Sequence, residues 1–277
     1  MTLIDISLPA LVSVFLLFII PLALSLLLRL RLIHTLVIAT GRMVLQLVLI
    51  GLFLKYLFQW NNVWINSVWL CIMITVAVFS VITASDLSWQ KILIPTFISF
   101  VLATGLVVFY LNTCVLRLDN VFDARYLVVM GGMVLGNSMR GNIVGISTFY
   151  HGLRKGYREY LYVLSLGATR FEAMVPFLRH AIELALKPSL AAMATIGVVS
   201  LPGMMTGVIL AGADPTVAIK YQIMIMLGII TSTTLSVVCT ILFTARVSFT
   251  SYGTLDYTIF KQENKKKTEE RKERVLS

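Results

Sequence analysis

The sequence predicts an all-α, polytopic integral membrane bundle with about seven transmembrane helices. Of its 277 residues, 58% are hydrophobic and only 13% are charged, and the mean hydropathy is +0.90. A helix needs about 20 apolar residues to cross a bilayer. Seven segments reach about that length, at approximately residues 6–28, 33–57, 63–83, 92–113, 126–146, 188–210 and 217–246. We therefore predict one transmembrane domain over residues 1–260 and a solvated or disordered charged tail over residues 261–277.

The basic residues predict the orientation of these spans. With the N-terminus outside, four basic residues fall on the outer side (Lys55, Arg117, Arg125 and Lys220), whereas most of the 23 Lys and Arg residues, including those from Arg140 to Lys187, fall inside. Cytosolic loops of membrane proteins carry such an excess. We predict an N-out, C-in protein of the cell membrane, in which the net charge of +10 reflects this bias and lipid contact rather than nucleic-acid binding.

When the basic residues are assigned to the two sides of the membrane, Arg42 in the second span is the one assigned to neither side. Arg42 lies about two turns in from the inner end, and Gln46 follows one turn later on the same face. A charge at the bilayer centre costs about 2.5–3.5 kcal/mol. Arg42 is therefore expected either to face a polar cavity or to snorkel to the headgroups.

The fifth span is rich in glycine, which lets transmembrane backbones approach closely. Asn137 falls about 16 Å from the outer end of this span at helical rise, at a depth similar to that of Gln46. These two amides are candidates to line a path together. Hydrogen bonding between helices is the alternative use of such buried amides.

A long polar interruption, about residues 150–187, precedes the sixth span. Gly167 is suited to close one helix, while Thr169 and Glu172 have the spacing of a capping box that starts the next helix at Arg170. Pro176 is expected to bend or end that helix after about two turns. These features predict a compact turn that projects from the bilayer. It is either a place where another protein docks or an ordinary capped turn between two helices.

The sixth span contains Pro202, Gly203 and Gly207 within six residues, with Met204, Met205 and Thr206 between them. This composition predicts a broken helix, a feature of many substrate sites in transporters. The methionines are alternatively adaptable packing beside a hinge, and thioethers suit Cu(I) better than iron.

Several chemistries are excluded by missing motifs. No Gly-x-x-x-x-Gly-Lys-Ser/Thr loop occurs, so ATP hydrolysis is not expected on this chain. No Asp, Glu or His lies deep in a predicted span, which disfavours proton-driven transport. Cys71, Cys114 and Cys239 have no metal-ligand spacing, and any metal site remains unknown. The chain is therefore not expected to be an enzyme or to hold a cofactor.

Four blocks of this sequence resemble the FetB-type permease family, which includes a bacterial iron-export permease and plant aluminium-tolerance relatives. The blocks are Arg42 with Gln46-Leu47, Gly136-Asn137-Ser138-Met139, Ser165-Leu166-Gly167-Ala168, and Leu201 to Gly207 followed by Ala218 to Gln222. The turn Ser165-Leu166-Gly167-Ala168-Thr169-Arg170, with Glu172, also resembles the coupling-helix loop of ABC-transporter permeases. It departs from the usual pattern because no Glu-Ala-Ala triplet precedes the glycine.

This resemblance implies a permease subunit of an ABC transporter that exports iron or another metal ion. It implies a cytosolic ATPase partner that carries ATP and Mg²⁺, self-association as a homodimer, and a turn at residues 165–172 that couples to the ATPase. We expect a substrate path formed by seven residues: Arg42, Gln46, Asn137, Met139, Met204, Met205 and Thr206. The alternative is a passive channel or membrane scaffold without ATP coupling, which would not need a capped helix pair outside the bilayer.

Overall fold

The computed structural model describes residues 7–30, 32–250 and 253–260, which are almost entirely helical. No β-strand forms within these residues, so the all-α prediction is confirmed. The predicted tail at 261–277 lies outside them. The elements are α1 (Leu8–Val14), η1 (Phe15–Phe18), α2 (Ile19–Leu27), α3 (Ile33–Trp60), α4 (Val63–Ala84), α5 (Trp89–Tyr110), η2 (Leu111–Val115), α6 (Ala124–Lys155), α7 (Tyr157–Ser165), α8 (Arg170–Thr195), α9 (Gly203–Leu210), α10 (Pro215–Ser248) and η3 (Tyr257–Ile259).

Five helical segments of the described chain are long and apolar enough to cross a membrane: Pro9–Leu27, Ile33–Trp60, Val63–Ala84, Trp89–Val115 and Pro215–Ser248. They coincide with the first four predicted spans and the last one. The fifth predicted span lies inside α6, whose 32 residues extend about 48 Å. The polytopic helical membrane fold is therefore confirmed, while its orientation stays a prediction.

The sixth predicted span does not form one helix. α8 runs through Pro176 and Pro188 to Thr195, so of the two outcomes expected at Pro176, a bend or an end, the end is wrong. Buried alanines on one face of α8, such as Ala181 and Ala185, pack against the bundle and offset the lost hydrogen bonds. The chain then leaves the helix at residues 196–202, where Gly197 has a φ of +88°, and α9 restarts beyond Pro202.

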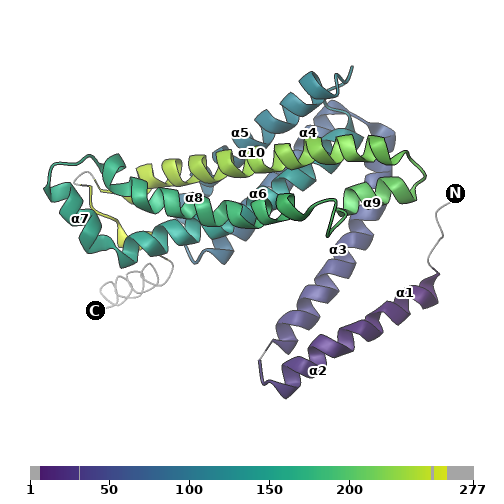
Figure 1. The fold of residues 1–277 in the computed structure, drawn as a ribbon, viewed down its shortest axis with the longest axis horizontal. Coiled ribbons are helices and arrows are strands. Elements are labelled where there is room, and N and C mark those ends of the chain that lie inside the picture. Colours follow the sequence, from purple (N-terminus) through teal and green to yellow (C-terminus); the bar gives the residue numbers. More distant parts are fainter. Residues whose placement is uncertain (1–6, 31, 251–252, 261–277) are drawn as a thin grey trace, which may run out of the picture.

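The core of the molecule is a bundle of α4, α5, α6, α8 and α10 (Figure 1). α6 packs closely on α10, because a Cβ at Gly141 would lie 2.4 Å from Thr233 Cγ2, and one at Gly145 would lie 2.7 Å from Val237 Cγ1. The predicted role of the glycine-rich span in close packing is therefore confirmed.

A polar seam runs along the same α6–α10 contact. Ser138 Oγ donates to Ser232 Oγ at 3.0 Å, and Asn142 Nδ2 donates to Ser236 Oγ at 2.6 Å. These side chains are fully buried. Because such groups are costly to leave unpaired in an apolar environment, the seam fixes the register of α6 against α10.

The N-terminal hairpin, residues 8–60, extends away from this bundle (Figure 1). Leu57, at the end of α3 nearest the bundle, is the one buried residue in that 28-residue helix. The remaining apolar side chains of α3 find little cover within the described chain, so lipid or another protein must surround them.

The C-terminal strap, residues 249–260 without the undescribed 251 and 252, turns back from the end of α10. It forms isolated bridges between Phe249 and Leu255 and between Phe260 and Leu87 in the α4–α5 turn. Leu255, Ile259 and Phe260 are buried. The strap therefore closes the core at the end of the molecule where α7 lies, which we call the α7 end.

Candidate functional site

The turn between α7 and α8 is locked by its own backbone. The Gly167 N–H donates to the Leu164 carbonyl at 3.0 Å, and the Ala168 N–H donates to the Val163 carbonyl at 3.4 Å. This pair of bonds is the Schellman pattern, which needs a left-handed residue after the helix. Gly167 supplies it with a φ of +91°.

The predicted capping box starts α8. Thr169 Oγ1 accepts from the Glu172 N–H at 3.3 Å, and Glu172 Oε2 accepts from the Thr169 N–H at 2.7 Å. The backbone bond and a side-chain bond from Thr169 lower the pKa of the Glu172 carboxyl. The two helices thus meet at a rigid corner, and this part of the sequence prediction is confirmed.

Apolar side chains project from this corner. Tyr162 is 65% exposed, Leu166 70% and Phe171 54%. Ser165, Thr169, Arg170 and Glu172 are also exposed around them. We call residues 162–172 the tip. An exposed apolar cluster with a polar rim is typical of a protein-docking surface.

The C-terminal strap ties the tip to the bundle. Tyr160, fully buried in α7, donates through Oη to the Gly253 carbonyl at 2.7 Å. Arg170 Nη1 donates to the Thr250 carbonyl at 3.4 Å. The strap therefore contacts both the tip and the helix that leads into it.

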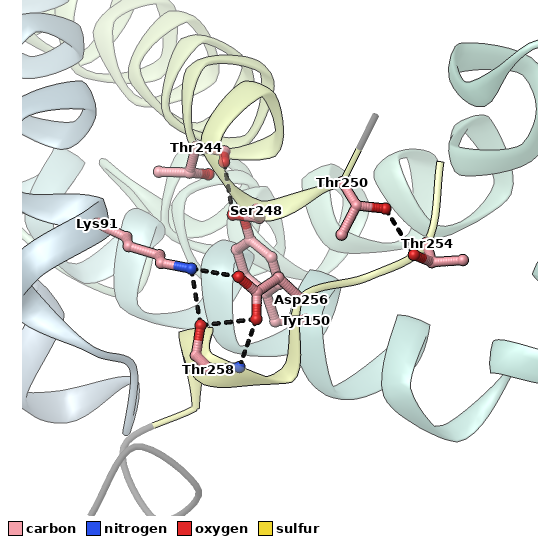
Figure 2. Close-up of polar contacts among 8 residues, drawn as sticks. All are labelled: Lys91, Tyr150, Thr244, Ser248, Thr250, Thr254, Asp256 and Thr258. Carbon is pink, nitrogen blue, oxygen red and sulfur yellow. Dashed lines mark hydrogen bonds and ion pairs between the residues drawn. The ribbon is translucent and has the colours of Figure 1, made fainter. Parts of the chain in front are cut away.

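Figure 2 shows how the strap is anchored on the other side. Lys91, at the start of α5, forms an ion pair with Asp256 and donates to Thr258 Oγ1 at 2.7 Å. Just before the strap, Tyr150 of α6 shares a 2.9 Å hydrogen bond with Ser248, the last residue of α10. Burial raises the pKa of Asp256, but hydrogen bonds from Lys91 and Thr258 outweigh it and lower this pKa to about 2. Asp256 thus stays ionised and paired at physiological pH.

A cavity of about 630 Å³ lies between α6, α8, α9 and α10, beside the break at residues 196–202. Two of the predicted path residues, Asn137 and Met204, line it together with Arg140 and Gln222. Asn137 uses its Nδ2 to donate to the Met133 carbonyl at 2.8 Å. The cavity combines a mainly apolar wall with a few polar groups, which is the usual composition of a small-molecule site.

Arg140 and Gln222 were not among the predicted path residues. Arg140 was counted with the inner-side charges, yet it lies three residues after Asn137 on the same face of α6. Its guanidinium forms no ion pair or hydrogen bond within the described chain. Gln222 is 5% exposed, and its Oε1 accepts no hydrogen bond there. The i, i+3 spacing from Asn137 was the available signal for Arg140.

The other predicted path residues are dispersed. Gln46 and Met139 line a second cavity of about 740 Å³, a largely apolar wedge between α3, α4 and α6. Arg42, Met205 and Thr206 line neither cavity, and Thr206 Oγ1 donates to the Gly203 carbonyl of its own helix at 2.9 Å. The structure thus does not bring Gln46 and Asn137 into one cavity.

No group of three or more His, Cys, Asp or Glu side chains in the described parts of the chain is arranged to hold a metal ion. The free cysteines are exposed or half-buried on separate helices.

Comparison with known proteins identifies a family for this chain. Residues 8–249 match the family described as "Uncharacterised protein family (UPF0014)". The probable iron export permease protein FetB of Escherichia coli is 31% identical over 81% of this chain and 85% of its own length. The UPF0014 membrane protein STAR2 of Oryza sativa is 32% identical over 77% of this chain and 74% of its own length. The protein ALUMINUM SENSITIVE 3 of Arabidopsis thaliana is 31% identical over 72% of this chain and 71% of its own length. No solved structure matches.

Proposed function

Because the chain belongs to the UPF0014 family of membrane proteins, whose members include a permease, we propose that it is the transmembrane permease subunit of an ABC transporter. A separate cytosolic ATPase subunit, with its ATP and Mg²⁺, supplies the energy. The cargo is iron or another metal ion, exported across the cell membrane, as the name of the FetB relative suggests.

The tip is the observation that carries this proposal. It presents Tyr162, Leu166 and Phe171 outside the long apolar helices, on a corner held by the Schellman bonds and the capping box. A rigid, partly apolar corner is suited to insertion into a groove of a partner and to transmission of force. A passive channel has no need of such a feature.

α8 provides the mechanical link between the tip and the cavity. It begins at the tip with Arg170 and ends at Thr195, where the break at residues 196–202 forms part of the cavity wall. A rigid-body tilt of α8, driven by closure of the ATPase on ATP, changes the shape of the cavity at that break. Such rocking of helices around a central site is a common form of alternating access.

Two further parts of the proposal concern assembly and orientation. The chain acts as a homodimer, since α3 leaves nearly all of its apolar surface uncovered by its own protomer. The α7 end faces the cytosol, in keeping with the N-out, C-in bias of the basic residues.

The test is co-purification of the chain in lipid with an ABC ATPase subunit from the same organism, followed by measurement of ATP turnover. Gly167→Trp adds bulk at the tip, where no atom lies within 4 Å of a built Cβ, and its φ of +91° also strains any side chain. Gly207→Trp on α9 is the control for added bulk at an open helical position, and thermal melting checks that each variant is folded. We expect the wild type and Gly207→Trp to bind and stimulate the ATPase, and Gly167→Trp to do neither. Equal behaviour of both variants, or no ATPase binding to the wild type, contradicts the proposal in favour of a channel or scaffold.

A further inference from the structure

The electrostatic character of the cavity between α6, α8, α9 and α10 has a direct bearing on its cargo. Arg140 is the one charged residue among those that line the cavity, and none of them is Asp, Glu, His or Cys. A bare divalent or trivalent cation that enters this space meets a fixed positive charge and no hard or borderline ligand. The lining therefore opposes the entry of a free metal ion.

The same wall is suited to an oxyanion. The guanidinium of Arg140 makes no ion pair or hydrogen bond within the described chain, so its donors are available to a ligand. A planar guanidinium matches the geometry of carboxylate and phosphate groups and binds them through two parallel hydrogen bonds.

Gln222 adds a second, independent observation from a different helix. Its side chain lies in the cavity wall on α10 and is 5% exposed, but its Oε1 has no donor within the described residues. A buried acceptor without a partner is costly. A hydroxyl group on the cargo supplies the missing donor.

We propose that this cavity binds a small hydroxylated organic anion, in which Arg140 pairs with a carboxylate or phosphate and Gln222 accepts from a hydroxyl. A metal that leaves through this protein leaves as the anionic complex of such a molecule. The inference deepens the proposed transport function and rests on it only for the direction and energy of movement. Binding itself requires neither the ATPase nor the metal.

Three methionines in the wall, Met133, Met204 and Met226, define the competing chemistry. Thioethers are soft ligands, and a set of them suits Cu(I) or Ag(I). A soft cation bound by these methionines would be repelled by the positive charge of Arg140, whereas a bound anion would be attracted to it. Silver(I) is therefore the informative cationic probe, with Mn²⁺ as the hard one.

The experiment measures binding of defined probes to the full-length chain in lipid nanodiscs by calorimetry. The anionic probes are citrate, tricarballylate, which is citrate without its hydroxyl, and glycerol 3-phosphate. The variants are Arg140→Gln, Arg140→Lys, Gln222→Leu and the control Arg125→Gln, which removes a positive charge from the same helix outside the cavity lining. Thermal melting checks that each variant is folded.

We expect citrate or glycerol 3-phosphate to bind the wild type and Arg125→Gln with equal affinity. Affinity falls at least 10-fold in Arg140→Gln and less in Arg140→Lys, which keeps the charge but loses the planar fork. The citrate and glycerol 3-phosphate arms identify which oxyanion is preferred. Where citrate binds, it binds more tightly than tricarballylate, and Gln222→Leu removes that difference.

Two results would overturn the inference. One is the absence of Arg140-dependent binding for every anionic probe. The other is binding of Ag⁺ or Mn²⁺ that tightens when Arg140 becomes Gln. Because the ATPase is absent from this assay, anion binding without later ATPase stimulation would contradict the proposed function alone.

Discussion

The α7 end and the N-terminal hairpin both expose apolar side chains, but they differ in how the chain supports them. At the α7 end, Leu166 and Phe171 project from a corner fixed by backbone hydrogen bonds, a capping box and the strap. In the hairpin, α3 buries Leu57 alone. The first surface is rigid before any partner arrives, whereas the second depends on its surroundings for cover.

This difference separates two kinds of membrane-protein surface. A surface that transmits force has to hold its shape without a partner, which accounts for the dense polar and aromatic contacts behind the tip. A surface that faces lipid or a second copy needs only apolarity and length, because lipid tails tolerate many side-chain arrangements. Substitutions that affect one kind of surface are therefore expected to leave the other unchanged.

The largest effect is expected from Tyr160→Ala behind the tip. The ring is fully buried, packs against Phe249 with 5.7 Å between ring centroids, and its Oη donates to Gly253. Loss of a buried aromatic ring costs about 3–5 kcal/mol of unfolding free energy. Tyr160→Phe keeps the ring and should cost about 1 kcal/mol. Unfolding in mixed micelles measures both, and a negligible effect of Tyr160→Ala would contradict the rigidity of the α7 end.

The next effect concerns the left-handed glycine of the tip. Gly167→Ala places a Cβ at a φ of +91°, which costs about 1–2 kcal/mol. Gly207→Ala on α9 is the control, because its position is helical and open, and it should gain up to about 1 kcal/mol. Melting temperatures should therefore move in opposite directions. A shift in the same direction for both would show that the corner is not held in the Schellman geometry.

A smaller effect, no more than about 1 kcal/mol, is expected from the Lys91–Asp256 pair of the strap, since both side chains are partly exposed. The pKa of Asp256 is lowered from 3.8 to about 2 in the folded protein. The stabilisation is therefore complete above about pH 4 and is lost as the pH falls towards 2. Asp256→Asn should lower the melting temperature at pH 6 but have less effect at pH 2.5. If Asp256→Asn lowered the melting temperature equally at pH 6 and pH 2.5, ionisation of Asp256 would be ruled out as the source of the stability.

The smallest effect on the isolated protomer is expected in the hairpin. Leu52 of α3 is 60% exposed, so Leu52→Ala should change the unfolding free energy of a detergent-solubilised monomer by less than about 0.5 kcal/mol. If a second copy covers α3, the same substitution shifts the monomer–dimer equilibrium in lipid. Single-molecule photobleaching in liposomes reports that shift. A large loss of monomer stability would mean that α3 packs on its own bundle.

The sequence predicted the features that depend on local chemistry. The capping box of Thr169 and Glu172, the closing role of Gly167 and the close packing of the glycine-rich helix follow from residue type and spacing, and the structure confirms them. Five of the seven predicted apolar spans were readable for the same reason, since each needs only length and hydropathy.

The sequence failed where tertiary packing decides the outcome. Pro176 was expected to bend or end its helix, but α8 continues through it, with the buried alanines of α8 packed against the bundle. The strap was missed because its residues carry no regular pattern and gain their structure from Lys91 and Tyr160. Gln46 and Asn137 share a predicted depth but lie in different cavities, because depth alone does not specify which faces meet.

Site-specific photo-cross-linking is the most direct test of the central claim that the tip docks an ATPase. A photoreactive amino acid replaces Leu166 at the tip or, as the matched control, Leu210 on α9, which is 65% exposed. The ATPase subunit is then added to the full-length chain in lipid. We predict a cross-linked adduct with the ATPase from position 166 and none from position 210. No adduct from 166, or equal adducts from both positions, would contradict the assignment of the tip as the coupling element.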